Sequence, residues 1–278
     1  PPPDNAYPDA DGLLSDLAAR RDRVRSFRAA GRVDHFGEEH RVQGKIYAFA
    51  QLPDRLRVDL LSPFGNALNV LTVDGDRFAM SDVREGTFVH GPAEPCNIAR
   101  LVRIPLPPGD VIRILVGHTP IIEGAAAVSW DRQQGRYLVE LRDGPLFQRL
   151  EVDPGDALPL RRSHLADAEG TVFDLRYDRW RRAADGISVP HEIRVKMPRE
   201  KADLAVLYDD DGVEVNVDLP DDAWTQEPAP GVNVQEVPNA NTNGMLVAQR
   251  IRDQLERRFA FRRACAAPKT ALRMMSYR

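Results

Sequence analysis

Hydrophobic and polar residues alternate along most of this chain with the period of β-strands. In the segment 54–61, Leu56, Val58 and Leu60 share one face and Arg57 lies on the other, because successive strand side chains point to opposite sides of a sheet. Gly-containing turn signals separate such segments from about residue 26 to residue 219. The pattern predicts strands at residues 27–35, 42–51, 54–61, 67–73, 77–82, 86–90, 125–130, 136–142, 146–152, 159–167, 171–180, 190–197, 204–208 and 213–217.

Two regions have helical spacing instead. Residues 11–25 place apolar side chains on one side of a helix and charges on the other. Residues 96–116 form two apolar helical segments on either side of the stiff sequence at 105–109. So many antiparallel strands must close into a barrel or curl around something. We therefore predict a mainly β fold with helices: an incomplete, half-open antiparallel β-barrel with a helical plug or lid.

The length of 278 residues and the hydrophobic content of 42% allow a sizeable core. The composition divides the chain into an N-terminal tether at 1–11, one barrel domain at 12–219, a linker rich in Pro, Asn and acidic residues at 220–243, and a basic amphipathic helix and tail at 244–278. A chain that begins at Pro1 rather than Met indicates removal of a targeting segment. No segment reaches the roughly 18 apolar residues of a membrane-spanning helix.

The C-terminal helix is predicted from apolar residues spaced four apart, Val247, Ile251, Leu255 and Phe259. Residues 245–278 carry nine Lys or Arg against two acidic residues, although the whole chain has a net charge of −4. Such a helix either lies on an anionic membrane or a partner, or packs on the barrel with a solvated arginine face. Both interpretations stay open, and neither indicates nucleic acid as a partner.

The sequence contains no motif of a known catalytic site. The six His residues are scattered without zinc-protease spacing, and neither a Gly-x-Ser-x-Gly elbow nor a phosphate-binding glycine loop is present. The acidic run 209–212 fits a charged hairpin turn better than a weak Ca²⁺ site. Cys96 and Cys265 are far apart and fit two free thiols better than a disulfide. We predict a protein that is not an enzyme and has no cofactor.

Several ordered motifs between Leu13 and Gly117 resemble the LolA/LolB-like carriers that move lipoproteins to the bacterial outer membrane. They are LLSDLAARRDRVRSFRAAGRV, GKIYAFAQLPDRLRVDLL, the loop SPFG, the turn VDGDRF and the insertion IPLPPGDVIRILVG. The resemblance implies an unclosed β-barrel that holds acyl chains on its concave side, under helices that act as a lid.

Two positions bear on the branch of this family. In the LolA-like soluble carriers an arginine that latches the lid precedes a Pro, whereas here Leu52 precedes Pro53. The LolB-like receptors are lipid-anchored at the outer membrane and use an exposed hydrophobic residue on a protruding loop. The resemblance places Phe64 at that position, and it therefore favours the LolB-like branch. The alternative for Phe64 is that its ring folds back over the hairpin as ordinary core.

We accordingly predict a periplasmic domain at the outer membrane, lipid-anchored just before Pro1, whose partners are acylated lipoproteins or lipids, the membrane surface and, through the basic helix, an envelope complex. The membrane-insertion loop consists of Pro63, Phe64 and Gly65. The acyl groove is predicted from Phe27, Tyr47, Phe49, Leu60, Phe78, Met80, Phe88, Ile104, Leu106, Ile114 and Leu115. Each buried methylene contributes about 0.8 kcal/mol, so a carrier needs apolar area rather than polar chemistry.

The alternative function is a non-transporting scaffold or accessory subunit of an envelope assembly, which keeps the fold but fills the groove with its own side chains. An apolar cavity of several hundred Å³ would favour the carrier, since roughly 300–1,000 Å³ is usual for ligand pockets. A packed interior would favour the scaffold.

Overall fold

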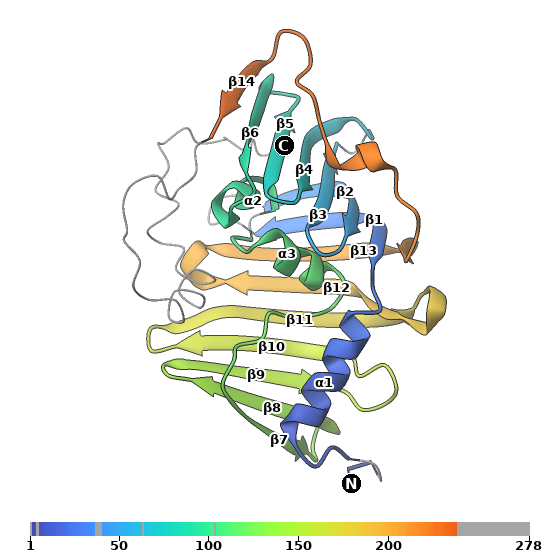
Figure 1. The fold of residues 1–278 in the computed structure, drawn as a ribbon, viewed down its shortest axis with the longest axis vertical. Helices are drawn as coiled ribbons and strands as arrows, with labels where there is room; N and C mark the ends of the chain where they lie inside the picture. Colours follow the sequence, from blue (N-terminus) through green and yellow to red (C-terminus); the bar gives the residue numbers. More distant parts are fainter. Residues whose placement is uncertain (1, 4–5, 37–40, 63, 103, 238–278) are drawn as a thin grey trace.

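The computed structural model of the chain describes residues 2–3, 6–36, 41–62, 64–102 and 104–237. These residues form one open sheet of 14 strands in the order β14-β6-β5-β4-β3-β2-β1-β13-β12-β11-β10-β9-β8-β7 (Figure 1). The strands are β1 (Ser26–Phe36), β2 (Arg41–Gln51), β3 (Arg55–Leu61), β4 (Ala67–Asp74), β5 (Arg77–Asp82), β6 (Thr87–Pro92), β7 (Ala125–Asp131), β8 (Arg136–Asp143), β9 (Leu146–Val152), β10 (Leu160–Asp167), β11 (Gly170–Arg182), β12 (Ser188–Met197), β13 (Ala202–Val215) and β14 (Asn233–Glu236).

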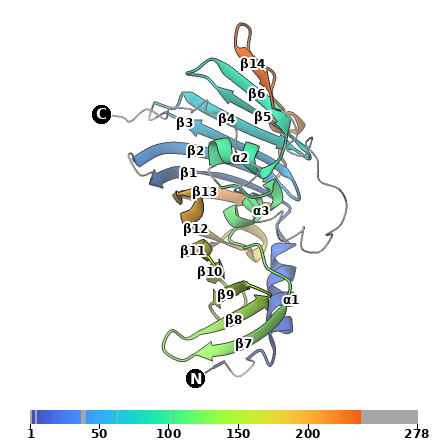
Figure 2. The same cartoon turned by 90° about the vertical axis from the view of Figure 1, so that its left-hand side faces the viewer.

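The sheet is curved and does not close on itself, because β7 and β14 lie at its opposite ends (Figures 1 and 2). Every strand pair is antiparallel except β14 with β6. The helices α1 (Ala10–Arg21), α2 (Pro95–Val102) and α3 (Pro108–Leu115) all lie against the same face, which we call the inner face (Figure 2). The prediction of a mainly β, half-open antiparallel structure with helices is confirmed.

Alternation within each strand produces the core. In β3, Leu56, Val58 and Leu60 are buried on the inner face, and the same face of β2 presents Ala48 and Ala50. Cross-strand pairing brings these residues into continuous rows, because directly paired residues of an antiparallel sheet lie on the same side. Burying such rows against the helices supplies the main stabilisation, at about 25 cal/mol per Å² of apolar surface.

The acidic run at 209–212 is not a hairpin turn, and the two strands predicted at 204–208 and 213–217 are one strand, β13. Its register against β1 shifts here, so that Ala29 pairs with Val213 but Gly31 with Tyr208. A Cβ at Gly31 would lie 2.3 Å from the carbonyl oxygen of Leu207, so this bulge requires glycine. The extra residues project as a bulge, a long-range register effect that local turn chemistry does not reveal.

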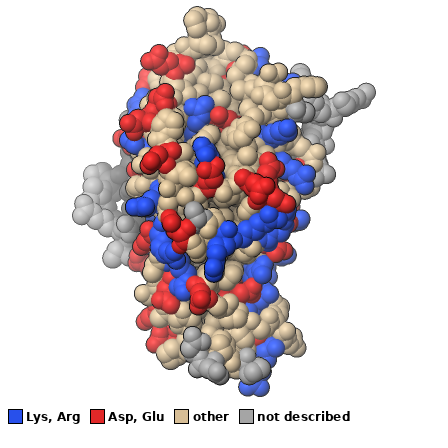
Figure 3. Space-filling model, turned by 90° about the vertical axis from the view of Figure 1, so that its right-hand side faces the viewer, with Lys and Arg blue, Asp and Glu red and all other residues tan. Residues whose placement is uncertain are grey.

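Ion pairs hold one of the bulge's acidic side chains, Asp210. Asp210 accepts from Arg179 at 2.7 Å and lies 2.8 Å from Arg181. Basic and acidic groups are likewise intermixed over the face shown in Figure 3. Within the described ranges no group of three or more His, Cys, Asp or Glu could hold a metal ion.

Part of the predicted N-terminal tether belongs to the folded domain. Asp9 caps α1, with its carboxylate accepting from the Gly12 amide at 2.8 Å. The ring of Tyr7 packs edge-on against Tyr137 of β8, with centroids 5.4 Å apart. The helix ends at Arg21 rather than at residue 25, because the chain turns there into β1.

Residues 220–226 pack on the outer face of the sheet and residues 233–236 extend its edge, which corrects the prediction of this part as a linker. Gln226 accepts from Ser81 at 2.7 Å and donates to Val70, Thr72 and Ala79 at 3.0–3.2 Å. The 3₁₀ turn η3 (Asp221–Trp224) buries Trp224 to 2% exposure, and β14 then adds to the edge of the sheet beside β6. The rest of the predicted linker and the whole basic helix at 244–278 lie outside the described residues.

Two further sequence expectations concern the membrane and the cysteines. In the described part of the chain, no helix has the length and apolarity needed to span a membrane. The thiol of Cys96, at the start of α2, is not free, contrary to the expectation of two free thiols. Cys265 lies outside the described residues.

Candidate functional site

The inner face brings together most of the residues predicted for the acyl groove. Phe27, Leu60, Phe78 and Met80 belong to the sheet, and each is 0–8% exposed. The covering segment from α2 to α3, which we call the plug (residues 95–115), buries its own members of the set: Ile104, Leu106, Ile114 and Leu115. All eight residues belong to one continuous apolar core. The plug lies in this core, in the place where the resemblance implies acyl chains.

The local sequence explains how the plug sits. Pro108 begins α3, where its missing N–H would have had no partner in the helix. Gly109 allows a close approach to the chain before β3, since a Cβ there would lie 2.9 Å from the carbonyl oxygen of Pro53. Leu52, where the LolA-like carriers have the latching arginine, packs against the apolar core. The side of the plug that faces the sheet thus packs against apolar side chains.

Tyr47, Phe49 and Phe88 lie on the other side of the sheet, so the structure corrects their assignment to the groove. Tyr47 and Phe49 alternate in β2 with the buried, inward-facing alanines, and Tyr47 is 45% exposed. Phe88 pairs with Ser81, which hydrogen-bonds to Gln226 on the outer face. The prediction assumed that the largest side chains line the groove. In β2, however, the small alanines face the plug and the large aromatic side chains face outward.

A segment that sequence reasoning missed crosses the inner face after α3. This strap, residues 117–122, is fixed by buried polar side chains from two strands. Gln148 of β9 donates to the carbonyl oxygen of Pro120 at 2.7 Å and accepts from the Ile122 amide at 2.9 Å. Ser163 of β10 bonds to both Gln148 and Thr119, at 3.1 and 2.9 Å. A polar residue at an inward-facing strand position was the available signal.

Two tyrosine hydroxyls fix the junction between plug and strap. Tyr208 of β13 donates to the carbonyl oxygen of Leu115 at 3.0 Å, and Tyr177 of β11 donates to that of His118 at 2.5 Å. Burial raises the pKa of both phenols, so they remain neutral donors. The C-terminal end of the plug is therefore held by hydrogen bonds, whereas the sheet side of the plug rests on apolar packing.

His118 should make stability depend on pH. Burial lowers its pKa from the ordinary 6.5 to about 4, with smaller contributions from Arg21 and Arg113. The unfolded chain then takes up the proton first as the pH falls, so stability present above pH 6.5 is lost toward pH 4, by up to roughly 3 kcal/mol. We expect His118→Gln to flatten this decline in urea unfolding measured at pH 7, 5.5 and 4.5. An unchanged decline would contradict the burial of a neutral imidazole.

The predicted membrane-insertion loop projects into solvent. Phe64 is 90% exposed, so its ring does not fold back over the hairpin. The Ser62 amide bonds to the carbonyl oxygen of Asn66 at 2.8 Å and closes the loop, with Gly65 at a φ of 85°. Pro63 lies outside the described residues.

Two more exposed hydrophobic residues lie at the same end of the sheet and were not predicted. Phe36, 41% exposed, ends β1, and Val83, 60% exposed, follows β5. Because β1, β3 and β5 run the same way, their C-terminal ends meet at one end of the sheet together with the Phe64 loop. We call Phe36, Phe64 and Val83 the hydrophobic rim.

A small cavity lies on the inner face among the described residues. A cavity of about 130 Å³ lies between α1, the strap and the ends of β10 to β12, lined in part by Leu17 and Ile187. This is well below the roughly 300–1,000 Å³ of usual ligand pockets. The plug and the strap pack into the hollow of the sheet as parts of one apolar core.

Comparison with solved structures identifies the fold. A DUF1329 family protein from Desulfovibrio piger has a TM-score of 0.56 and 15% identity over 77% of this chain and 96% of its own. A LolA superfamily protein from Nitrosomonas europaea has a TM-score of 0.51 and 14% identity over 79% of this chain and 99% of its own. The sequence matches no protein-family model. At these identities the likeness concerns the fold alone: this chain has a LolA-like fold, an open curved sheet with helices on its inner face.

Proposed function

We propose that this protein binds the acyl chains of lipoproteins on the inner face of its sheet and assists their insertion into the bacterial outer membrane, from a position at the periplasmic face of that membrane. The observation that carries the proposal is the plug: one chain segment buries apolar side chains in the same core as the wall residues Phe27, Leu60, Phe78 and Met80. An acyl chain offers the wall the same kind of surface that the plug offers.

Exchange of plug for cargo is energetically plausible because it replaces one apolar contact by another. The cost of moving the plug is the loss of its buried area, and the acyl chain returns about 0.8 kcal/mol for each methylene that it buries. The hydrogen bonds from Tyr177 and Tyr208 hold the end of the plug, so α2 and the 104–107 connection can move while the strap stays in place. Because Leu52 stands where the LolA-like carriers have the latching arginine, no such latch would hold the plug against the sheet when it moves.

The hydrophobic rim supports the membrane part of the proposal. A Phe side chain contributes roughly 1.5–3 kcal/mol when it leaves water, which is enough to bring the domain to a bilayer but not to anchor it. Placing the rim at one end of the sheet would bring that end of the hollow on the inner face to the membrane surface. The LolB-like branch, the lipid anchor before Pro1 and the partner-binding basic helix belong to the same proposal.

The scaffold remains the second candidate function, and a specific observation favours it. The inner face is filled by the chain's own side chains, and the outer face of β3 to β5 is covered by residues 220–226. A scaffold would keep this packing permanently.

A single experiment separates the two functions. The protein is mixed with a triacylated lipopeptide, and bound lipopeptide is counted by native mass spectrometry. Leu106→Ala removes a plug side chain that is 2% exposed, which weakens the plug by about 2–4 kcal/mol and should raise the bound fraction above that of the wild type. The matched control is Leu138→Ala, on the outer face of β8, which should bind as the wild type does. If neither the wild type nor the Leu106 variant binds lipopeptide, the scaffold is the correct function.

A further inference from the structure

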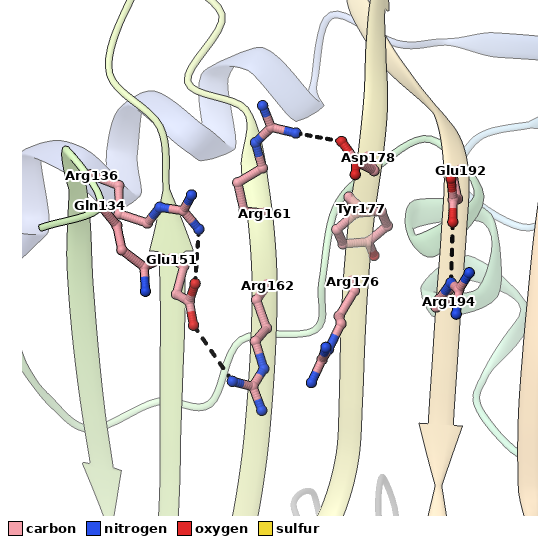
Figure 4. A pocket seen from close by; sticks show the side chains of 10 residues that line it. All are labelled: Gln134, Arg136, Glu151, Arg161, Arg162, Arg176, Tyr177, Asp178, Glu192 and Arg194. Carbon is pink, nitrogen blue, oxygen red and sulfur yellow. Dashed lines mark hydrogen bonds and ion pairs between the residues drawn. The ribbon is translucent and has the colours of Figure 1, made fainter. Parts of the chain in front are cut away.

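The outer face of the sheet contains an arginine-lined cavity that is remote from the plug. It has a volume of about 580 Å³ and spans β8 to β12 (Figure 4). Its lining includes five arginines, Arg136, Arg161, Arg162, Arg176 and Arg194, and three acidic residues. The volume lies within the roughly 300–1,000 Å³ of ligand pockets, which the cavity on the inner face does not reach.

Strand register places three of these arginines in a row. Arg162 of β10 pairs with Arg176 of β11, which pairs in turn with Arg194 of β12. Neighbouring strands are about 4.8 Å apart, and like charges directly opposite each other destabilise a sheet. The arrangement therefore works against folding stability unless the guanidinium groups are compensated.

The three arginines of the row differ in how well carboxylates neutralise their positive charges. Arg162 donates twice to Asp174, at 2.8 and 2.9 Å, and lies 3.6 Å from Glu151. Arg176 has to share the same Asp174, at 3.2 Å. Arg194 donates only from Nε to Glu192, at 3.1 Å, among the residues that the structure describes.

The two weakly held guanidinium groups belong to the most exposed side chains among the arginines that line the cavity. The side chains of Arg176 and Arg194 are 58% and 57% exposed, whereas Arg136 is 22% exposed and paired with Glu151 at 3.0 Å. A guanidinium has five N–H donors in a rigid fork, and each of these two uses one donor on a carboxylate. Most of their donors therefore have no protein partner among the described residues, and the two residues pair directly across adjacent strands. Figure 4 shows the Arg176 guanidinium extending toward Arg162 and that of Arg194 lying against Glu192.

We propose that this outer-face cavity binds a small ligand through a phosphate or carboxylate group held by Arg176 and Arg194, with the Arg162 side of the cavity receiving the rest of the ligand. The guanidinium fork matches the geometry of both anions, and the bound anion supplies the charge that Asp174 and Glu192 leave uncompensated. The shared chemistry admits two sources, a free sugar phosphate or sugar acid and the headgroup of an anionic phospholipid. The site lies on the opposite side of the sheet from the plug and does not depend on acyl-chain binding.

The proposal is tested by calorimetric titration of the full chain with glucose 1-phosphate and with glucuronate, and by sedimentation with phosphatidylglycerol and phosphatidylcholine vesicles. We expect binding of at least one anionic probe, and a loss of at least about 10-fold in affinity in Arg176→Ala/Arg194→Ala. The matched control is Arg149→Ala, a 47% exposed arginine on the same face of β9 outside the cavity, with an expected change below about 2-fold.

The vesicle arm separates the sources. Preference for phosphatidylglycerol vesicles without binding of the soluble sugars assigns a headgroup, and binding of either sugar assigns a free ligand. Arg176→Lys/Arg194→Lys keeps the charges but removes the forks, so we expect it to recover less than half of the lost binding free energy. If no anionic probe binds, or if the double alanine variant binds as tightly as the Arg149 control, the proposal is wrong. Neither result bears on lipopeptide binding at the inner face.

Discussion

Replacing Gln148 by Ala is expected to lower the free energy of unfolding by about 3 kcal/mol, because the side chain is 0% exposed and its amide satisfies several strap groups at once. Without it, the Ile122 N–H and the Pro120 carbonyl stay buried without their partners, and Ser163 loses one of two contacts. Each orphaned buried group costs about 1–3 kcal/mol. Guanidinium chloride unfolding followed by tryptophan fluorescence measures the loss.

The control for this prediction is Gln134→Ala. Gln134 is exposed in the turn between β7 and β8, where a substitution should change stability by less than about 0.5 kcal/mol. Limited proteolysis adds an independent readout, because a released strap should become cleavable between residues 117 and 122. Equal stabilities of the two variants, with an uncleaved strap, would show that the strap is held by apolar packing and that Gln148 is dispensable.

Phe64→Glu is expected to weaken association with outer-membrane-like vesicles by roughly 10- to 100-fold. The substitution removes the roughly 1.5–3 kcal/mol that a Phe gains on leaving water, and it adds a charge that resists burial. Since the ring is 90% exposed in the protein, the melting temperature should not change. Vesicle sedimentation at several lipid concentrations measures the affinity.

The matched control carries the same charge change on an exposed aromatic residue away from the rim. Tyr47→Glu alters a side chain that is 45% exposed in the middle of β2, on the outer face, and should leave vesicle binding unchanged. Similar losses for both variants would indicate a general charge effect. No loss for the Phe64 variant would remove the loop from the membrane proposal without affecting the lipopeptide experiment.

The sequence was a good guide wherever structure depends on neighbours along the chain. The predicted strand at 54–61 is β3, Arg55–Leu61, because an alternating segment has one way to bury its apolar side. The sequence was a poor guide to which residues from distant parts of the chain come into contact. Alternation already separated Tyr47 and Phe49 from Ala48 and Ala50, but it could not say which side the plug would cover.

The candidate site shows the same division. The exposed loop at Phe64 was predictable from a local turn motif and a family resemblance, and the position of the plug from a helical interruption among strands. The positions of Phe36 and Val83 in the hydrophobic rim were not predictable from the sequence. The rim exists only because the alternate strands β1, β3 and β5 run in the same direction and end at the same side of the sheet. Gln226 was read as part of a linker, and its hydrogen bonds to β4 and β5 depend on residues more than 140 positions away.

By itself, the sequence determined a sheet of antiparallel hairpins with helices for its hollow, because alternation, turn residues and helical spacing act over a few positions. Tertiary structure alone decided that the plug and strap share the core of the sheet, that residues 220–226 cover part of its outer side, and that Arg162, Arg176 and Arg194 stand in a row. The physical reason is register: shifting a strand by one residue exchanges its two faces, and the register of distant strands is fixed by packing across the whole sheet.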